Sequence, residues 1–186
     1  GNPEERFGED SLRILRAIRF SAQMGFDIEE ETLAAISRLA HTLDRVSAER
    51  IRVELVKLLV SPHPEHLRLA YETGVTKVFF PEFDQAMETP QKHPHHCCSV
   101  GEHILRSMQH VQADKVLRLA MLLHDIGKPK VLTVDPDGTT HFHGHAAVGA
   151  DTAEAFLYRL KMDKDTIRRV CTLVRCHDYG NSLEPD

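Results

Sequence analysis

Leu123-His124-Asp125-Ile126-Gly127-Lys128 is the most informative stretch of this 186-residue sequence. It follows an apolar run over 116–123 that predicts a buried helix, which Gly127 and Pro129 then end. A His-Asp pair at the end of such a run is costly to bury, and we expect a divalent metal ion to compensate it. Imidazole and carboxylate together suit Mn, Fe, Ni, Co or Zn, whereas carboxylate alone suits Mg. The plainer alternative is a polar helix cap, because a histidine there favours the helix dipole.

Histidine is unusually frequent, and its positions favour the metal hypothesis. The chain has 13 histidines, and nine of them lie within 93–145. One histidine on an apolar helix face is usually an ordinary core residue. Here four successive predicted helices each offer a histidine at or near an end, and antiparallel helices can bring their ends together. The candidate metal ligands are His103, His124, Asp125, His145 and His177.

The composition is that of an ordinary globular protein, with 41% hydrophobic and 27% charged residues. No long apolar run, signal-peptide pattern or lipidation signal occurs, so we expect no membrane partner. The four cysteines form no C-x-x-C pair, which favours reduced thiols in a cytoplasmic protein. The net charge of -5 and the absence of tryptophan argue against a general nucleic-acid-binding surface, so any such contact would be a local patch.

The apolar periodicity predicts an all-α fold with one small hairpin or ordered loop at 133–143. Proline-containing breaks at 61–64 and 81–94 mark two candidate boundaries. In the first half, helices are predicted over 9–24, in a segment capped by Asp27, over 47–60 and in a short segment that ends at Gly74. In the second half, they are predicted over 100–111, 116–124, 145 to about 161, and 166–177. The sequence therefore predicts three parts, 1–60, 61–94 and 95–186.

The histidine pattern resembles the HD superfamily of metal-dependent phosphohydrolases. That family has a histidine, then a His-Asp pair after a leucine-rich helix and often before Gly-Lys, and then a distal aspartate. The resemblance implies that His103, His124 and Asp125 bind the main metal ion. It implies that His145 and His177 are the extra ligands of members with two metals.

Phosphate-ester hydrolysis is the reaction that the HD resemblance implies. A metal ion lowers the pKa of bound water and polarises the phosphoryl oxygen. Asp125 could also orient the attacking water, and Lys128 or Arg175 could contact phosphate oxygens, although single basic residues are more often solvated. The distal aspartate has no convincing counterpart, since Asp178 adjoins His177 and Asp186 is terminal. We expect that ligand to lie beyond residue 186, or the site to be incomplete.

A second informative stretch spans 2–20 and reads Asn-Pro-Glu-Glu-Arg-Phe-Gly-Glu-Asp-Ser-Leu-Arg-Ile-Leu-Arg-Ala-Ile-Arg-Phe. It is similar to the neck of bacterial CCA-adding enzymes, the class II tRNA nucleotidyltransferases, and of their poly(A) polymerase relatives. The segments 25–32 and 49–51 fit the same family. In some of its members an HD domain follows the neck, and the pattern over 95–103 fits its beginning.

In that family a Glu-Asp-x-x-Arg motif reads the base of the incoming nucleotide. Carried over to this sequence, the base-reading residues are Asp10 and Arg13, with Glu9 and Arg16 as supports. We expect Asp10 and Arg13 to lie on one helical face, as their spacing allows. The alternative from spacing alone is a solvated helix face with intrahelical ion pairs worth about 0.2–0.5 kcal/mol each.

The two resemblances together give one functional hypothesis. Residues 1–60 are the neck, 61–94 a connecting body segment and 95–186 the HD domain of a tRNA nucleotidyltransferase, without its Asp-x-Asp head. The implied partners are a tRNA 3' end, CTP or ATP in the whole enzyme, and a phosphate ester at the HD site. Two alternatives stay open: a free-standing HD nucleotidase or phosphodiesterase, and a non-catalytic RNA-binding module.

Overall fold

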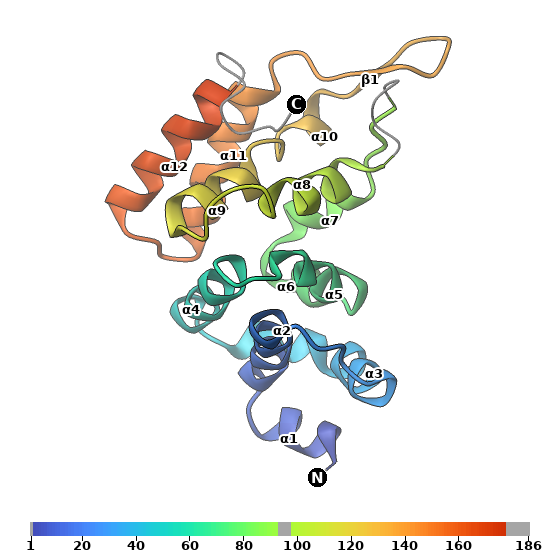
Figure 1. Ribbon diagram of the computed structural model, residues 1–186, viewed down its shortest axis with the longest axis vertical. Coiled ribbons are helices and arrows are strands. Elements are labelled where there is room, and N and C mark those ends of the chain that lie inside the picture. Colours follow the sequence, from blue (N-terminus) through green and yellow to red (C-terminus); the bar gives the residue numbers. More distant parts are fainter. Residues whose placement is uncertain (1, 93–97, 178–186) are drawn as a thin grey trace.

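The computed structural model describes residues 2–92 and 98–177, so His95, His96, Asp178 and Asp186 lie outside the described residues. The described part is helical apart from one two-stranded antiparallel sheet, which confirms the predicted all-α fold. The helices stack from α1 at one end to the α11–α12 pair at the other (Figure 1). No helix in this part of the chain is long and apolar enough to cross a membrane.

The first half consists of α1 (Pro3–Glu9), α2 (Leu12–Met24), α3 (Glu30–Leu39), η1 (Ala40–Arg45), α4 (Ala48–Leu59), η2 (Pro64–His66), α5 (Leu67–Glu72), α6 (Val75–Phe79) and α7 (Pro81–Met87). The second half consists of α8 (Val100–Met108), α9 (Lys115–Leu123), α10 (Lys128–Val131), β1 (Thr133–Val134), β2 (Thr140–His141), α11 (His145–Arg159) and α12 (Lys164–Cys176). The strands pair through Thr133 with His141 and Val134 with Thr140, as the predicted hairpin requires.

Helix α2 is the centre of the first half. Its buried face of Ile14, Leu15 and Ile18 packs toward α4, because apolar residues at helical spacing share one side. Gly25 ends α2 in the left-handed conformation, with φ of 74°, which glycine adopts without strain. Ser47 caps α4 by accepting a hydrogen bond from the amide of Arg50, as its position predicts.

One helix was not predicted, and two local predictions were wrong. The unpredicted helix is the segment 3–9, which Asn2 caps and where Pro3 fits the first helical position. The 81–94 stretch begins with helix α7, since Pro81 also stands at a first helical position. The cap of α3 is Glu29 rather than Asp27.

The second half is built around α9, whose Leu119, Leu122 and Leu123 are buried. Helices α8, α11 and α12 pack against α9, and α11 and α12 form an adjacent pair. Gly127 lies against the start of α11, where a Cβ would come within 2.4 Å of the carbonyl oxygen of His145. Only a residue without a side chain permits this close approach.

Polar contacts join the two halves. Arg68 on α5 donates two hydrogen bonds to Glu102 on α8, at 2.9 and 2.7 Å. Buried Arg118 on α9 donates to the carbonyl oxygens of Leu59 and Ser61 after α4, at 2.5 and 3.0 Å. These bonds hold the helix that ends at the His-Asp pair against the connection between α4 and α5.

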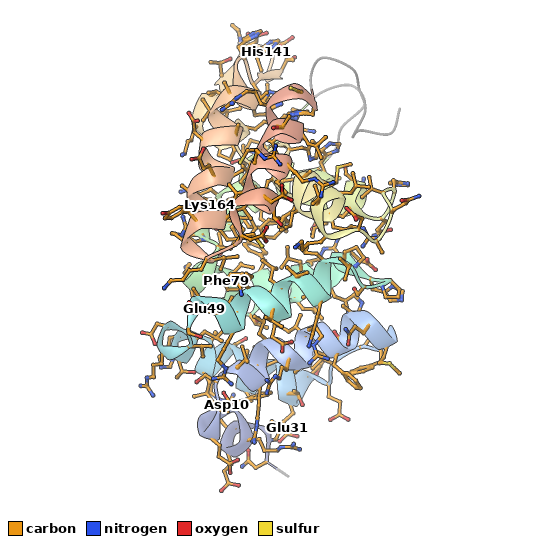
Figure 2. The ribbon with its side chains drawn as sticks, turned by 90° about the vertical axis from the view of Figure 1, so that its left-hand side faces the viewer. Asp10, Glu31, Glu49, Phe79, His141 and Lys164 are labelled. Carbon is orange, nitrogen blue, oxygen red and sulfur yellow. The ribbon has the colours of Figure 1, made fainter. Side chains whose placement is uncertain are left out.

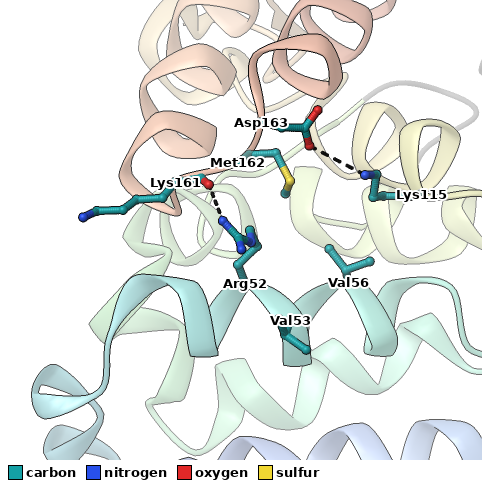
Figure 3. A pocket seen from close by; sticks show the side chains of 7 residues that line it. All are labelled: Arg52, Val53, Val56, Lys115, Lys161, Met162 and Asp163. Atoms are coloured by element: carbon teal, nitrogen blue, oxygen red, sulfur yellow. Dashed lines mark hydrogen bonds and ion pairs between the residues drawn. The ribbon is translucent and has the colours of Figure 1, made fainter.

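A small surface pocket marks a further junction, between α4 and the α11–α12 turn (Figure 3). Arg52 donates a hydrogen bond to the carbonyl oxygen of Lys161, and Lys115 pairs with Asp163 at 3.7 Å. Lys161 has φ of 56°, a left-handed conformation that a side chain makes uncommon. The turn therefore contacts α4 through the Lys161 carbonyl and α9 through the Asp163 side chain.

Candidate metal centre

Four helices bring the five predicted metal ligands to one place. The side chains come from α8 (His103), from the residues just after α9 (His124 and Asp125), from the first residue of α11 (His145) and from the residue after α12 (His177). The Asp125 carboxylate is fully buried, and the His177 side chain is 2% exposed. The convergence of helix ends expected from the sequence is therefore present.

The Asp125 carboxylate stands between two pairs of imidazoles. Its Oδ2 lies 3.1 Å from Nε2 of His124 and 3.4 Å from Nε2 of His103. Its Oδ1 lies 3.3 Å from Nε2 of His145 and 3.6 Å from Nε2 of His177. The group thus divides into two triads that share Asp125, each with ligand atoms within 4.8 Å of one another.

Backbone carbonyls fix the tautomers of three of these histidines. A carbonyl only accepts, so Nδ1 of His124, His145 and His177 each donates a proton to it. The acceptors belong to Met121, Phe142 and Val174, at 2.5, 3.0 and 2.6 Å respectively. The Nε2 atoms then direct their lone pairs toward the Asp125 carboxylate, unless a second proton binds there. This arrangement is typical of metal-binding histidines.

Two further contacts require positive charge at this position. Nε2 of His145 lies 3.1 Å from Nε2 of His177, so two acceptors face each other. Oδ1 of Asp125 is buried and has no well-aligned hydrogen bond within the described residues. Acceptors this close repel unless a proton or a metal ion lies among them. The donor set therefore fits a divalent cation.

The electrostatics keep the central carboxyl ionised. Burial raises the pKa of Asp125, but the contacts with His124, His145 and His177 outweigh burial and lower that pKa well below its ordinary value. Burial alone would lower the pKa of His177. The hydrogen bonds to the Asp125 carboxylate and the Val174 carbonyl outweigh burial, so this pKa is raised above its ordinary value. The Asp125 carboxylate is accordingly available to a cation at neutral pH.

Lys128 also reaches the centre. Its Nζ lies 3.0 Å from Oδ2 of Asp125 and donates to Oε1 of Gln91 at 3.0 Å. Gln91 lies before α8 and is 4% exposed, and the sequence offered no signal for it because it belongs to no motif. Arg175 is not gathered with this group, and instead lies 3.8 Å from Asp151 on an exposed surface.

The four predicted nucleotide-binding residues belong to α1, α2 and the link between them, in the half of the molecule that does not hold the metal group; Figure 2 labels one of them, Asp10. Arg13 on α2 pairs at 2.8 Å with Glu9, the last residue of α1. Asp10 is extended, with φ of −149° and ψ of 107°, and joins α1 to α2. The expectation that Asp10 and Arg13 share one helical face was therefore wrong. Asp10 instead lies 3.3 Å from Arg50 and 3.9 Å from Arg16.

Arg16 and Arg19 are fixed by one buried acid that the sequence analysis missed. Glu54 on α4 is 3% exposed, and it accepts from Nε of Arg16 at 3.1 Å and from Nε of Arg19 at 2.8 Å. These arginines line a wide groove of about 870 Å³ together with the partly exposed rings of Phe20 and Phe26. The sequence could have indicated Glu54, because it is one acidic residue on an otherwise apolar face of the predicted helix 47–60.

Comparisons with known proteins agree with both halves of this structure. Residues 25–87, which include α3 to α7, match the region described as "Probable RNA and SrmB- binding site of polymerase A". Residues 95–184, which include α8 to α12, match the HD domain. The chain is 37% identical, over 94% of its length, to the CC-adding tRNA nucleotidyltransferase of Thermus thermophilus. It is 35% identical, over 94% of its length, to the A-adding tRNA nucleotidyltransferase of Deinococcus radiodurans.

The chain is thus similar to tRNA nucleotidyltransferases over nearly its whole length. A multifunctional CCA protein of Neisseria gonorrhoeae is 34% identical over 92% of this chain. The chain spans 43% of the length of each of these three relatives. The RNA-binding match precedes the HD match along the chain, in the order that the sequence predicted. The names of the relatives mention different nucleotides, since one is CC-adding and another A-adding.

Proposed function

We propose that this chain forms the RNA-binding neck and the HD centre of an enzyme that processes tRNA 3' ends. In this proposal the HD centre is a metal-dependent phosphohydrolase. The observation that carries it is the buried Asp125 carboxylate, which contacts four imidazoles in two pairs. A purely structural cluster has no need of so many acceptors around one buried carboxylate.

His103, His124 and Asp125 would hold the first ion, and Asp125, His145 and His177 the second. Imidazole and carboxylate suit Mn, Fe, Ni, Co or Zn better than Mg. A bound ion would supply an activated water and neutralise charge on the phosphate.

Asp125 and Lys128 would position the attacking water and the phosphate group. Asp125 accepts a hydrogen bond from the attacking water and so orients it toward phosphorus. Lys128, 12% exposed and held by Gln91, binds a phosphate oxygen when its contact with Asp125 is exchanged for the substrate. We assign catalytic roles to these two residues. Phosphomonoesters and 2',3'-cyclic phosphates are the proposed substrates, because both occur at RNA ends and both expose a phosphorus atom to attack by water.

In the neck, we propose that Asp10 and Arg13 read the base of CTP or ATP, with Glu9 and Arg16 as supports, in a longer protein that supplies the transfer centre. Cytosine and adenine each present an amine donor beside a ring-nitrogen acceptor. A carboxylate accepts from the amine, and a guanidinium donates to the ring nitrogen. The exposure of Arg13, 39%, and its place along the arginine-lined groove support this assignment. Residues 1–60 would thus be the neck, 61–94 the connecting segment and 95–186 the HD domain.

The hydrolase proposal is tested with the purified chain after chelation. We expect 2',3'-cyclic nucleotide or aryl phosphate hydrolysis to return with Mn, Ni or Co and to fall at least about 100-fold in Asp125→Asn. His143→Gln is the matched control, because His143 is exposed in the adjacent loop. Hydrolysis that survives both chelation and Asp125→Asn would show that the activity arises elsewhere.

A further inference from the structure

The connection between α4 and α5 gathers a second set of ligand-type side chains. His63, Glu65 and His66 belong to the sequence Ser61-Pro62-His63-Pro64-Glu65-His66, and one possible ligand atom of each lies within 4.8 Å of the others. The side chains of His63 and Glu65 are 44% and 21% exposed, so an ion can enter from solvent. We propose that these three residues form a metal site that is separate from the HD centre and takes a Zn²⁺-class ion.

The first argument is the tautomer of His66. The Ser21 hydroxyl donates its only proton to the carbonyl oxygen of Ile18, at 2.7 Å. It must therefore accept from Nδ1 of His66, which lies 3.0 Å away. The proton stays on Nδ1, and the lone pair is on Nε2. His124, His145 and His177 in the HD centre have the same tautomer, because a backbone carbonyl, in place of the serine, accepts the Nδ1 proton of each.

The second argument is a buried carboxylate oxygen. Oε1 of Glu65 lies 3.2 Å from Nδ1 of His63, but Oε2 is buried and has no hydrogen-bond partner within the described residues. The charges of Arg68 and Arg118 act on Glu65, but a buried carboxylate oxygen without a hydrogen-bond donor is still costly. A metal ion beside Glu65 would remove that cost.

The third argument is that the segment is held in place before any ion binds. Pro62 and Pro64 restrict its backbone, and Arg118 fixes its start by donating to the Ser61 carbonyl at 3.0 Å. Gly25 leaves room for the His63 ring, because a Cβ there would lie 2.8 Å from Nε2 of His63. Ordering the ligands therefore costs little entropy on binding.

The donor set selects the class of ion. Two imidazoles and one carboxylate suit Zn²⁺, Co²⁺ or Ni²⁺, whereas Mg²⁺ and Ca²⁺ prefer oxygen ligands. Three protein ligands leave at least one position to water, so the ion would be exchangeable. An ion here would connect α2, through Ser21 and His66, to the α4–α5 connection.

Zinc stoichiometry tests this proposal, with equilibrium dialysis at fixed free Zn²⁺. The HD centre is first disabled by His124→Gln and Asp125→Asn. We expect that background to retain about one Zn²⁺ per chain and to lose it when His63→Gln and His66→Gln are added. The matched control is His41→Gln with His110→Gln, two exposed histidines, and it should retain the ion. A background that binds no Zn²⁺, or that keeps its ion after His63→Gln and His66→Gln, overturns the proposal.

A second measurement covers the case in which the disabled background does not fold. In the otherwise unchanged chain, titration with Co²⁺ is followed by visible absorption, and His63→Gln with His66→Gln should remove about one equivalent. The control pair should leave the titration unchanged. Equal Co²⁺ equivalents in the His63→Gln, His66→Gln variant and the unchanged chain would contradict the site. Because the hydrolase proposal depends on other residues, either proposal can fail alone.

Discussion

Nε2 of His145 and Nε2 of His177 lie 3.1 Å apart, while carbonyl oxygens hold the Nδ1 protons of both rings. Both nitrogens also approach the same atom, Oδ1 of Asp125. Three acceptors that converge in this way repel one another unless a proton or a metal ion lies among them. The relationship joins α11 to α12 across the centre and explains why two residues 32 positions apart belong to one site.

His177→Gln should lower the metal content by about one equivalent per chain, because it removes one ligand from the triad with Asp125 and His145. The triad with His103 and His124 keeps all its ligands. The measurement is elemental analysis after dialysis against Mn²⁺, with His143→Gln as the control. An unchanged Mn²⁺ content would mean that His177 is a structural residue.

Glu102→Gln should destabilise the chain at pH 7 by about 1–2 kcal/mol, because Arg68 loses a charged, two-point partner. The Arg68 hydrogen bond, though opposed by burial, lowers the pKa of Glu102 below its ordinary 4.5. Because the folded-state pKa of Glu102 is lowered, its interaction with Arg68 stabilises the fold fully above about pH 4.5. This stabilisation is lost as the pH falls through the folded-state pKa and Glu102 is protonated.

The measurement for Glu102 is urea unfolding of both proteins between pH 3 and 7. The free-energy difference between them should shrink toward acid. As a control, Arg168 and Asp165 form an exposed pair on α12, and Asp165→Asn should change little. A Glu102→Gln effect that is constant from pH 3 to 7 would exclude the ion pair as its cause.

Gly127→Ala should destabilise the protein strongly, by about 3 kcal/mol or more, since the new Cβ would meet the backbone of His145 and Gly149 at 2.4 Å. Metal binding should weaken with it, because His145 would be displaced. Gly8→Ala is the matched control: nothing lies within 4 Å of its Cβ, and alanine in a helix should stabilise by about 0.5–1 kcal/mol. In thermal unfolding, the midpoint temperature should fall for Gly127→Ala and rise for Gly8→Ala. Equal effects would contradict the close approach of Gly127 to α11.

Asp10→Ala and Arg13→Ala, placed in a longer protein with a transfer centre, should reduce discrimination against UTP and GTP. A mispaired base edge costs about 1–3 kcal/mol per group, which corresponds to roughly 10- to 100-fold. The assay is incorporation of each nucleotide at the tRNA 3' end. Arg38→Ala, an exposed arginine paired with Glu4, is the control. Unchanged discrimination in both variants would leave Asp10 and Arg13 with only a structural role.

Much of the fold and of the candidate site was predictable from sequence because it depends on local patterns. Apolar periodicity and Ser47 located α4, and histidines at successive helix ends predicted the cluster around Asp125. Contacts between distant residues were not predictable. Gln91 contacts Lys128, 37 positions away in the sequence, and Glu54 on α4 contacts Arg16 on α2.

The wrong prediction at Asp10 has a similar cause. Its spacing from Arg13 fits one helix, but Asp10 accepts a hydrogen bond from the amide of Leu12 at 3.1 Å and so separates α1 from α2. Asp competes with helical backbone bonds in this way, which makes it a residue of helix ends. Spacing alone could not distinguish a continuous helix from two helices joined at Asp10.

The most direct test of the metal centre is a crystal structure of the chain grown with Co²⁺, with anomalous differences measured at the cobalt edge. Our account predicts a peak about 2.0–2.2 Å from Nε2 of His124 and from a carboxylate oxygen of Asp125, with a second beside His145 and His177. A map without a peak at Asp125, in crystals that contain the four histidines in the same positions, would contradict it.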